Sequence, residues 1–286
     1  RSLEALIKSG AMDILGTNRA TAFSAIDSLL RIAGTNAEMQ AAGQHSLFPA
    51  QGNSGLEHVL KPTVEWHDRD KLLFEKESLG FYLTDHPFNE YKNHASQFTN
   101  GSITKVTHAL PKDRKYFSSK SKVSIAGLVC DIYRNRNTIS IILDDTTSKI
   151  EVIVFEDIYS KYQNKIMKDS ILYVEGQLSY DEFNNNWRLK ALFIDTIDQA
   201  IEKNAKRLTI SFNSNDNKSI LSKNLKQALQ AYRGGDCDVY LYYTNSKAST
   251  SVKLGSDWSI SLKRDARDKI SSLFGDEGYN IHYKKS

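Results

Sequence analysis

The spacing of apolar residues predicts helices at the start of this chain. Leu3, Leu6 and Ile7 follow the i, i+3, i+4 spacing of one helix face, and residues 17–33 repeat that pattern. Gly10 lies between the two stretches and suits a helix end in the left-handed conformation. We expect two short helices joined by a glycine-containing turn. Such turns can bind phosphates through backbone N–H groups, although the residues alone favour a plain helical pair.

The helical spacing is lost between residues 34 and 64, where small and polar residues dominate and a linker is expected. One cluster stands out there, Gln44-His45-Ser46-Leu47-Phe48, which is followed by Pro49. An apolar pair in a flexible segment can dock into a pocket of a partner protein. Equally, Leu47 and Phe48 could pack against the neighbouring helices, and the residues do not decide between these alternatives.

Helical spacing returns after the linker. Residues 66–79 predict a helix with Asp68 and Asp70 in its first turn, where carboxylates are favourable, and Gly80 at its end. A further short helix is expected over 87–98. His86 and His94 have no cysteine or carboxylate pattern around them, so we interpret them as structural residues and not as metal ligands.

Residues 122–195 change to the alternating pattern of strands. Three strands, one helix and two further strands follow each other, which is the order of a five-stranded OB-fold β-barrel. Gly127 and Gly176 suit tight bends in barrel strands. The expected strands are 123–129, 138–143, 149–155, 171–180 and 188–194, with the helix over 157–167.

OB-fold barrels bind single-stranded nucleic acid on the second and third strands and on the loops beside them. Six residues of this barrel have the aromatic or basic character that such binding uses. The candidates are Tyr133, Arg134, Arg136, Lys149, Phe183 and Trp187. Residues 122–195 carry 9 basic and 11 acidic groups, a net charge of −2, which argues against tight electrostatic binding. Barrels of this type also serve as protein-contact modules.

The remaining residues predict a small α+β domain with helices over 219–232 and 263–274. Its expected strands are 207–212, 239–244, 249–254, 258–262 and 279–283. The pair of Asp236 and Asp238 around Cys237 matches no metal-binding spacing that we can justify. The whole chain is therefore expected to be multidomain α+β: a helical N-terminal part, a five-stranded barrel and a small α+β C-terminal domain.

Composition fits an ordinary globular protein. The chain has 286 residues, of which 40% are hydrophobic and 25% charged, with a formal net charge of +4. Two cysteines exclude a disulfide scaffold, and no apolar run is long enough for a membrane span. We expect two or three domains, a cytoplasmic location, no membrane partner, and a chain that is the C-terminal piece of a longer protein. The net charge is +1 over residues 1–121 and +5 over 196–286.

No sequence pattern for catalysis is present. The chain has no glycine-rich phosphate loop, no nucleophile elbow, and no HExxH or CxxC. We therefore predict no catalytic residue and no metal ligand in this chain.

Two long sequence segments resemble the same protein family. Residues 3–16, LEALIKSGAMDILG, resemble the end of the helix-hairpin-helix region of the bacterial replicative DNA polymerase III α subunit of the DnaE type. Residues 75–87, EKESLGFYLTDHP, resemble that family's E-K-E-x-L-G-x-Y-L-x-x-H-P word. Between them, Gln44-His45-Ser46-Leu47-Phe48 resembles the family's internal clamp-binding pentapeptide, Gln-x-x-(Leu or Met)-Phe.

The resemblance implies five regions and their partners. Gln44 would hydrogen-bond the pocket rim of the sliding clamp, the β subunit, while Leu47 and Phe48 would fill the pocket. The hairpin would contact duplex primer-template DNA, the barrel would lie near the single-stranded template, and the last domain would contact the clamp-loader τ subunit. The regions are 1–34, the end of the hairpin region; 35–65, the linker with the pentapeptide; 66–121, a helical connector; 122–200, the OB-fold domain; and 201–286, the τ-binding-like domain.

The resemblance also concerns activity. The intact protein would be a DNA-directed DNA polymerase, a nucleotidyltransferase of chromosomal replication. Its catalytic palm, with the expected Mg²⁺, would precede these residues, so this chain is expected to be inactive alone and to hold no cofactor.

Two other classes of function remain open from the sequence. One is a free-standing adaptor that binds single strands through the barrel, which submicromolar oligonucleotide binding by residues 122–195 alone would favour. The other is an enzyme with an unrecognised metal site in the C-terminal domain, which metal analysis of the purified chain would test.

Overall fold

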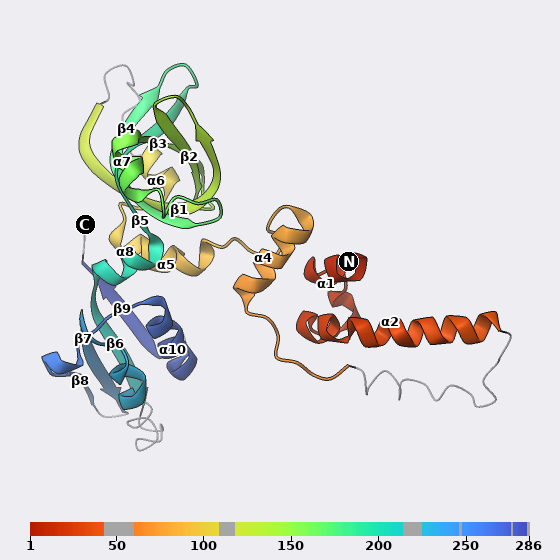
Figure 1. Cartoon of the computed structure of the whole chain (residues 1–286). Helices are drawn as coiled ribbons and strands as arrows, with labels where there is room; N and C mark the ends of the chain where they lie inside the picture. The colour runs from red at the N-terminus through yellow and green to blue at the C-terminus, as the bar shows by residue number, and fades with distance from the viewer. Residues whose placement is uncertain (43–59, 109–117, 214–224, 246–247, 276, 285–286) are drawn as a thin grey trace. The chain divides into compact units, whose positions relative to one another are not determined.

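A computed structural model describes residues 1–42, 60–108, 118–213, 225–245, 248–275 and 277–284 of the chain. These residues form two compact units, Arg1–Pro87 and Phe88–Ser286, and each is described by itself. The first unit is helical, and the second contains a barrel and an open sheet (Figure 1). No helix in the described ranges is both long enough and apolar enough to cross a membrane.

The N-terminal unit contains the expected pair of helices and the expected later helix. Its elements are α1 (Ser2–Lys8), the 3-10 helix η1 (Asp13–Leu15), α2 (Arg19–Ala41) and α4 (Asp68–Leu79). The prediction that the second helix ends before Gly34 was wrong, because α2 continues to Ala41. Alanine, glutamate, methionine and glutamine after Gly34 favour a helix, and one interior glycine costs only about 1 kcal/mol.

A buried group of charges connects the elements of this unit. Arg19 at the start of α2 is only 6% exposed, and its guanidinium lies 2.8 Å from Asp13 and 2.9 Å from Glu75. Glu75 is fully buried and also accepts hydrogen bonds from the backbone N–H groups of Leu83 and Thr84. Leu83 and Thr84 therefore fold back onto Glu75, the first residue of the segment 75–87. Gly80 permits the turn because its φ is 85°.

The second unit contains the closed five-stranded barrel that the sequence predicts. Its strand order is β1-β2-β3-β5-β4, and parallel pairing of β3 with β5 closes it. Alternate residues of each strand fill the interior, including Ile141, Val152 and Leu189, which are fully buried. The elements are β1 (Ser118–Arg134), β2 (Thr138–Asp144), β3 (Lys149–Phe155), α7 (Glu156–Tyr162), β4 (Ile171–Asp181) and β5 (Asn186–Thr196).

Gly176 allows two barrel strands to approach closely. It lies where the register between β4 and β5 shifts, and a Cβ atom at this position would lie 2.3 Å from the carbonyl oxygen of Lys190. We expect Gly176→Ala to lower the free energy of unfolding by about 1–3 kcal/mol, because backbone atoms must move apart. Urea unfolding followed by circular dichroism measures the change. Gly255→Ala is the control, since a Cβ there meets nothing within 4 Å, and equal stability of both variants would contradict this prediction.

Three further helices pack against the barrel: α5 (Asn89–Phe98), α6 (Ile103–His108) and α8 (Ile197–Asn204). The sequence predicted α5 but gave no sign of α6 or α8. Phe98 at the end of α5 is fully buried, and its ring centroid lies 5.7 Å from that of Tyr173 in β4 and 5.1 Å from that of Tyr283. Tyr283 belongs to the last strand of the chain, so α5 packs against both sheets of this unit.

The C-terminal residues form the expected small α+β domain, a four-stranded sheet in the order β8-β7-β6-β9. The prediction of a strand over 258–262 was wrong. Residues Ser256–Trp258 form the 3-10 helix η3, and Ile260 makes only isolated bridges to β7. Gly234 and Gly235, which directly follow the helix expected over 219–232, lie inside β7. The elements are β6 (Ala205–Asn213), β7 (Arg233–Thr244), β8 (Ser249–Lys253), α10 (Arg264–Phe274) and β9 (Tyr279–Tyr283), with 225–230 helical.

Candidate nucleic-acid interface

The outer surface of β1, β2 and β3 carries Tyr133 near one end and Lys149 at the other, and does not bring the six predicted residues together. Tyr133 of β1 pairs in register with Ser140 of β2, which pairs in turn with Ile153 of β3. Neighbouring strands lie about 4.8 Å apart, so these three side chains form a row across the sheet. Tyr133 is 55% exposed, which leaves its ring accessible to a stacked base.

A second aromatic residue, Phe155, lies on the same surface and was missed by the sequence analysis. It ends β3 two residues beyond Ile153, points to the same face, and is 39% exposed. The Nζ atom of Lys190 in β5 lies 4.8 Å from the centroid of its ring. This cation–π contact places a positive charge beside an exposed ring. We call Tyr133, Ile153, Phe155 and Lys190 the barrel face.

The two predicted arginines near this face differ in their surroundings. Arg134 ends β1, lies 4.0 Å from Glu156 of α7, and stacks at 5.7 Å over the ring of Tyr159. Arg134 therefore reaches toward α7. Arg136 is exposed in the turn between β1 and β2, beyond the end of Tyr133's strand.

Lys149 and Phe183 lie at the opposite end of β3. Lys149 begins this strand and lies 3.6 Å from the carboxylate of Asp144. Phe183 is 95% exposed in the turn between β4 and β5. Six residue steps of about 3.3 Å separate Lys149 from Phe155, so the start of β3 lies about 20 Å from the end that carries Phe155.

Trp187 does not lie on the outer surface. Its side chain is 9% exposed, belongs to the barrel core, and packs edge-on against Tyr180 at a centroid distance of 5.0 Å. The alternation of β5 explains this placement, because Arg188 beside it points outward. Trp187 is therefore a core residue and not part of the outer surface.

Carboxylates neutralise part of the positive charge on the barrel. Arg188 contacts Glu151 at 2.5 Å and Asp181 at 2.9 Å, and Lys149 contacts Asp144. This pairing agrees with the net charge of −2 that the sequence gives for residues 122–195. Binding on this barrel would therefore depend on stacking more than on charge.

The start of α2 already holds an anion. Both carboxylate oxygens of Glu65 accept backbone hydrogen bonds, from Arg19 and from Ala20, each at 3.0 Å. Burial raises the pKa of Glu65, but hydrogen bonds from Trp66, Arg19 and Ala20 outweigh it and leave the pKa below its usual value. The backbone N–H groups of Arg19 and Ala20, which could otherwise hold a phosphate at the start of α2, are thus occupied by the chain itself, which favours the plain helical pair.

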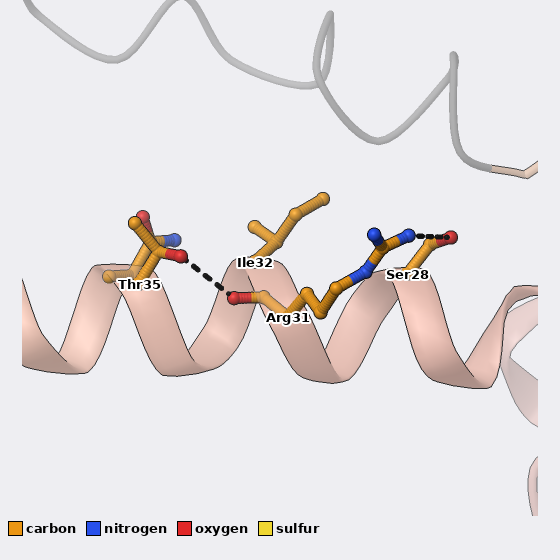
Figure 2. A pocket seen from close by; sticks show the side chains of 5 residues that line it. Ser28, Arg31, Ile32 and Thr35 are labelled. Carbon is orange, nitrogen blue, oxygen red and sulfur yellow. Dashed lines mark hydrogen bonds between the residues drawn. The ribbon is translucent and has the colours of Figure 1, made fainter.

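A shallow hollow lies along the surface of α2, lined by Ser28, Arg31, Ile32, Thr35 and Asn36. Figure 2 shows Arg31 hydrogen-bonded to Ser28, and the Thr35 hydroxyl donating to the backbone oxygen of Arg31. Ile32 is the single apolar side chain among the five lining residues. Small-molecule sites are usually concave and enclosed, whereas residues of a single helix line this hollow, so it does not resemble one.

No group of three or more histidine, cysteine, aspartate or glutamate side chains in the described ranges could hold a metal ion. In the C-terminal domain, Cys237 is buried, which raises the pKa of its thiol to about 12. The neighbouring Asp238 pairs with Lys253 at 2.6 Å. Cys237 and Asp238 therefore do not form a metal site.

The clamp-binding prediction, Gln44, His45, Ser46, Leu47 and Phe48, lies outside the described residues.

Comparison with known proteins supports the family resemblance. Residues 123–197 match the model of the OB-fold nucleic acid binding domain, and residues 224–275 match that of the DNA polymerase III subunit alpha, C-terminal domain. DNA polymerase III subunit alpha of Escherichia coli K12 is 32% identical over 285 residues, 99% of this chain. The chain resembles DNA polymerase III subunit alpha along nearly its whole length.

Further relatives carry the same name. DNA polymerase III subunit alpha of Vibrio cholerae is 28% identical over 99% of this chain, and that of Pasteurella multocida is 27% identical over 99%. In each of these three relatives, the matched part is 24% of the protein. The chain thus spans about a quarter of the length of these DNA polymerase III alpha subunits.

Proposed function

We propose that this chain is the C-terminal accessory region of a DNA-directed DNA polymerase that replicates the chromosome in the cytoplasm. Its barrel contacts the single-stranded template. The observation that carries this proposal is the similarity to DNA polymerase III subunit alpha over 99% of the chain, together with an OB-fold barrel. Any Mg²⁺ chemistry of polymerisation would belong to residues outside this chain.

The barrel face supports the template contact. Tyr133 and Phe155 are exposed rings on adjacent parts of one surface, and Lys190 lies beside the second ring. Stacking on an aromatic side chain contributes about 1–3 kcal/mol per base and tolerates any base sequence. A polymerase that copies every sequence requires such tolerance.

The chain also tethers the polymerase to two partner proteins. Gln44, Leu47 and Phe48 have the spacing of a clamp-binding pentapeptide, and we propose the sliding clamp as their partner and the clamp-loader τ subunit as the partner of the C-terminal domain. Each contact would be weak alone. Linked contacts to clamp, τ and DNA raise the overall affinity, because each bound contact increases the local concentration of the next.

We expect the double substitution Tyr133→Ala and Phe155→Ala to weaken binding of oligothymidylate at the barrel of the full chain about thirtyfold or more, because two stacking rings of about 1–3 kcal/mol each are lost. Fluorescence anisotropy of a labelled oligonucleotide at constant salt measures this change. Phe81→Ala is the control, since Phe81 is also 55% exposed but lies in the N-terminal unit. Equal affinity of the double variant and the wild type would refute the template contact.

A further inference from the structure

Among the described residues, helices cover one face of the C-terminal sheet, and the side chains on its other face are half-buried or exposed. α10 and the helical residues 225–230 pack with inward residues of the strands in a single core, which includes Leu208, Val239 and Ile281. Figure 1 shows α10 beside β6 and β9. Neighbouring residues in a strand point to opposite faces, so the residues between these core positions point away from the helices. We call Arg207, Ser211, Tyr240, Tyr242, Ser251 and Lys253 the open face, and each of them is half-buried or exposed.

Tyr242 is the most accessible ring on the open face, with 37% exposure. Its register neighbours on the adjacent strands are Ser211 of β6 and Ser251 of β8. Both are small, so no larger side chain stands directly beside the ring across either strand. Tyr242 therefore offers a flat aromatic surface with room beside it.

Tyr240 lies two residues earlier in the same strand, about 7 Å from Tyr242, and points to the same face. Two cations flank its ring: the guanidinium of Arg207 at 5.1 Å and the Nζ atom of Lys253 at 5.9 Å. Lys253 is neutralised by Asp238 at 2.6 Å. Arg207, in contrast, forms no ion pair within the described structure, and its Nε atom is buried without a hydrogen-bond partner.

We propose that the open face is a second binding site for single-stranded nucleic acid, independent of the barrel. Two successive bases stack on Tyr242 and Tyr240, and a backbone phosphate pairs with Arg207. Four-stranded sheets that carry aromatic residues on an uncovered face bind single strands by this mode of stacking. The net charge of +5 over residues 196–286 favours an anionic strand.

An acidic peptide is the other partner that a basic, aromatic face could accept. Such a peptide would depend mainly on cations, and Asp238 already neutralises one of the two cations on this face. The paired tyrosines supply stacking that does not depend on charge, and only planar ligands such as bases use it fully. The arrangement of residues therefore favours nucleic acid.

The test uses the full chain and a fluorescein-labelled oligothymidylate, measured by anisotropy at two salt concentrations. Tyr242→Ala is made in the wild type and in the Tyr133→Ala and Phe155→Ala background, so that binding at the barrel cannot hide the effect. We expect Tyr242→Ala to weaken binding about fivefold to a hundredfold in the Tyr133→Ala and Phe155→Ala background, and by a smaller factor in the wild type, where the barrel still binds. Tyr242→Phe keeps the ring and should bind as the parent chain does. Arg207→Gln should reduce the slope of log affinity against log salt by about 0.7.

Photo-crosslinking with an iodouracil-containing oligonucleotide gives a second readout that does not depend on folding of a variant. We expect crosslinked peptides that contain Tyr240 or Tyr242. Any one of three results would overturn the proposal. The first is an oligonucleotide affinity of Tyr242→Ala within twofold of the parent in both backgrounds, and the second is crosslinks confined to residues 122–195. The third uses labelled polyglutamate as the acidic peptide: Tyr242→Ala loses polyglutamate binding but keeps oligonucleotide binding.

Discussion

Replacement of Glu75 by alanine should lower the free energy of unfolding of the N-terminal unit by about 3–5 kcal/mol. Glu75 is fully buried, and its carboxylate binds Arg19 and the backbone N–H groups of Leu83 and Thr84. The substitution removes one partner of the buried arginine and leaves two backbone donors without an acceptor. Asp13 still binds Arg19, which keeps the loss within this range.

Hydrogen exchange with mass spectrometry, carried out across a urea series, measures this effect in α2 and α4 separately from the second unit. Glu77→Ala is the matched control. It lies two residues away in α4, and its carboxylate is 63% exposed in an ion pair with Lys8. Exposed pairs contribute about 0–1 kcal/mol, so similar protection in the two variants would refute the structural role of Glu75.

The same carboxylate makes the stability of this unit depend on pH. Burial raises the pKa of Glu75, but hydrogen bonds from Thr84 and Leu83 and the guanidinium of Arg19 outweigh it and leave the pKa below its usual value. A lowered pKa in the folded state stabilises the protein above the unfolded value of 4.5, and this stabilisation is lost as the pH falls below it. Glu75→Gln should show a smaller loss of stability between neutral pH and pH values below 4.5.

The second large effect concerns the pentapeptide. Leu47→Ala with Phe48→Ala should abolish binding of the chain to a purified sliding clamp, because both apolar anchors of the peptide are removed. A titration of the clamp followed by surface plasmon resonance measures the loss. An unchanged affinity of the double variant for the clamp would refute the tethering proposal.

Two controls separate docking from folding. His45→Ala with Ser46→Ala changes the positions that the Gln-x-x-Leu-Phe pattern leaves open, and this variant should keep its affinity. The Leu47 and Phe48 double variant should also unfold at the same urea concentration as the wild type. A large drop in stability would indicate instead that these side chains pack inside their own chain.

The sequence predicted local elements well where alternation and turn residues agree. The strand at Lys149–Phe155 and the last strand at Tyr279–Tyr283 have the predicted bounds. It failed where tertiary contacts decide the conformation. Residues 258–262 have strand-like composition, but Ile260 finds only isolated bridges along β7, so no ladder forms.

The candidate site was only partly predictable for the same reason. Phe155 and Lys190 meet because β3 and β5 pair in parallel, and no local pattern reveals that pairing. Conversely, the aromatic character of Trp187 suggested a surface role, but the alternation of β5 turns its ring into the core. Residue type identified the candidates, and only the register decided which of them share a surface.

The carboxylate of Glu65 at the start of α2 has a thermodynamic consequence for DNA. A phosphate that approached the N–H groups of Arg19 and Ala20 would first have to displace an anion that the protein supplies itself. The cost of that exchange would be subtracted from the affinity of the phosphate. A phosphate of duplex DNA could then bind at the start of α2 only if other protein–DNA contacts offset the free energy of displacing Glu65. The hairpin would therefore bind DNA that is already held elsewhere.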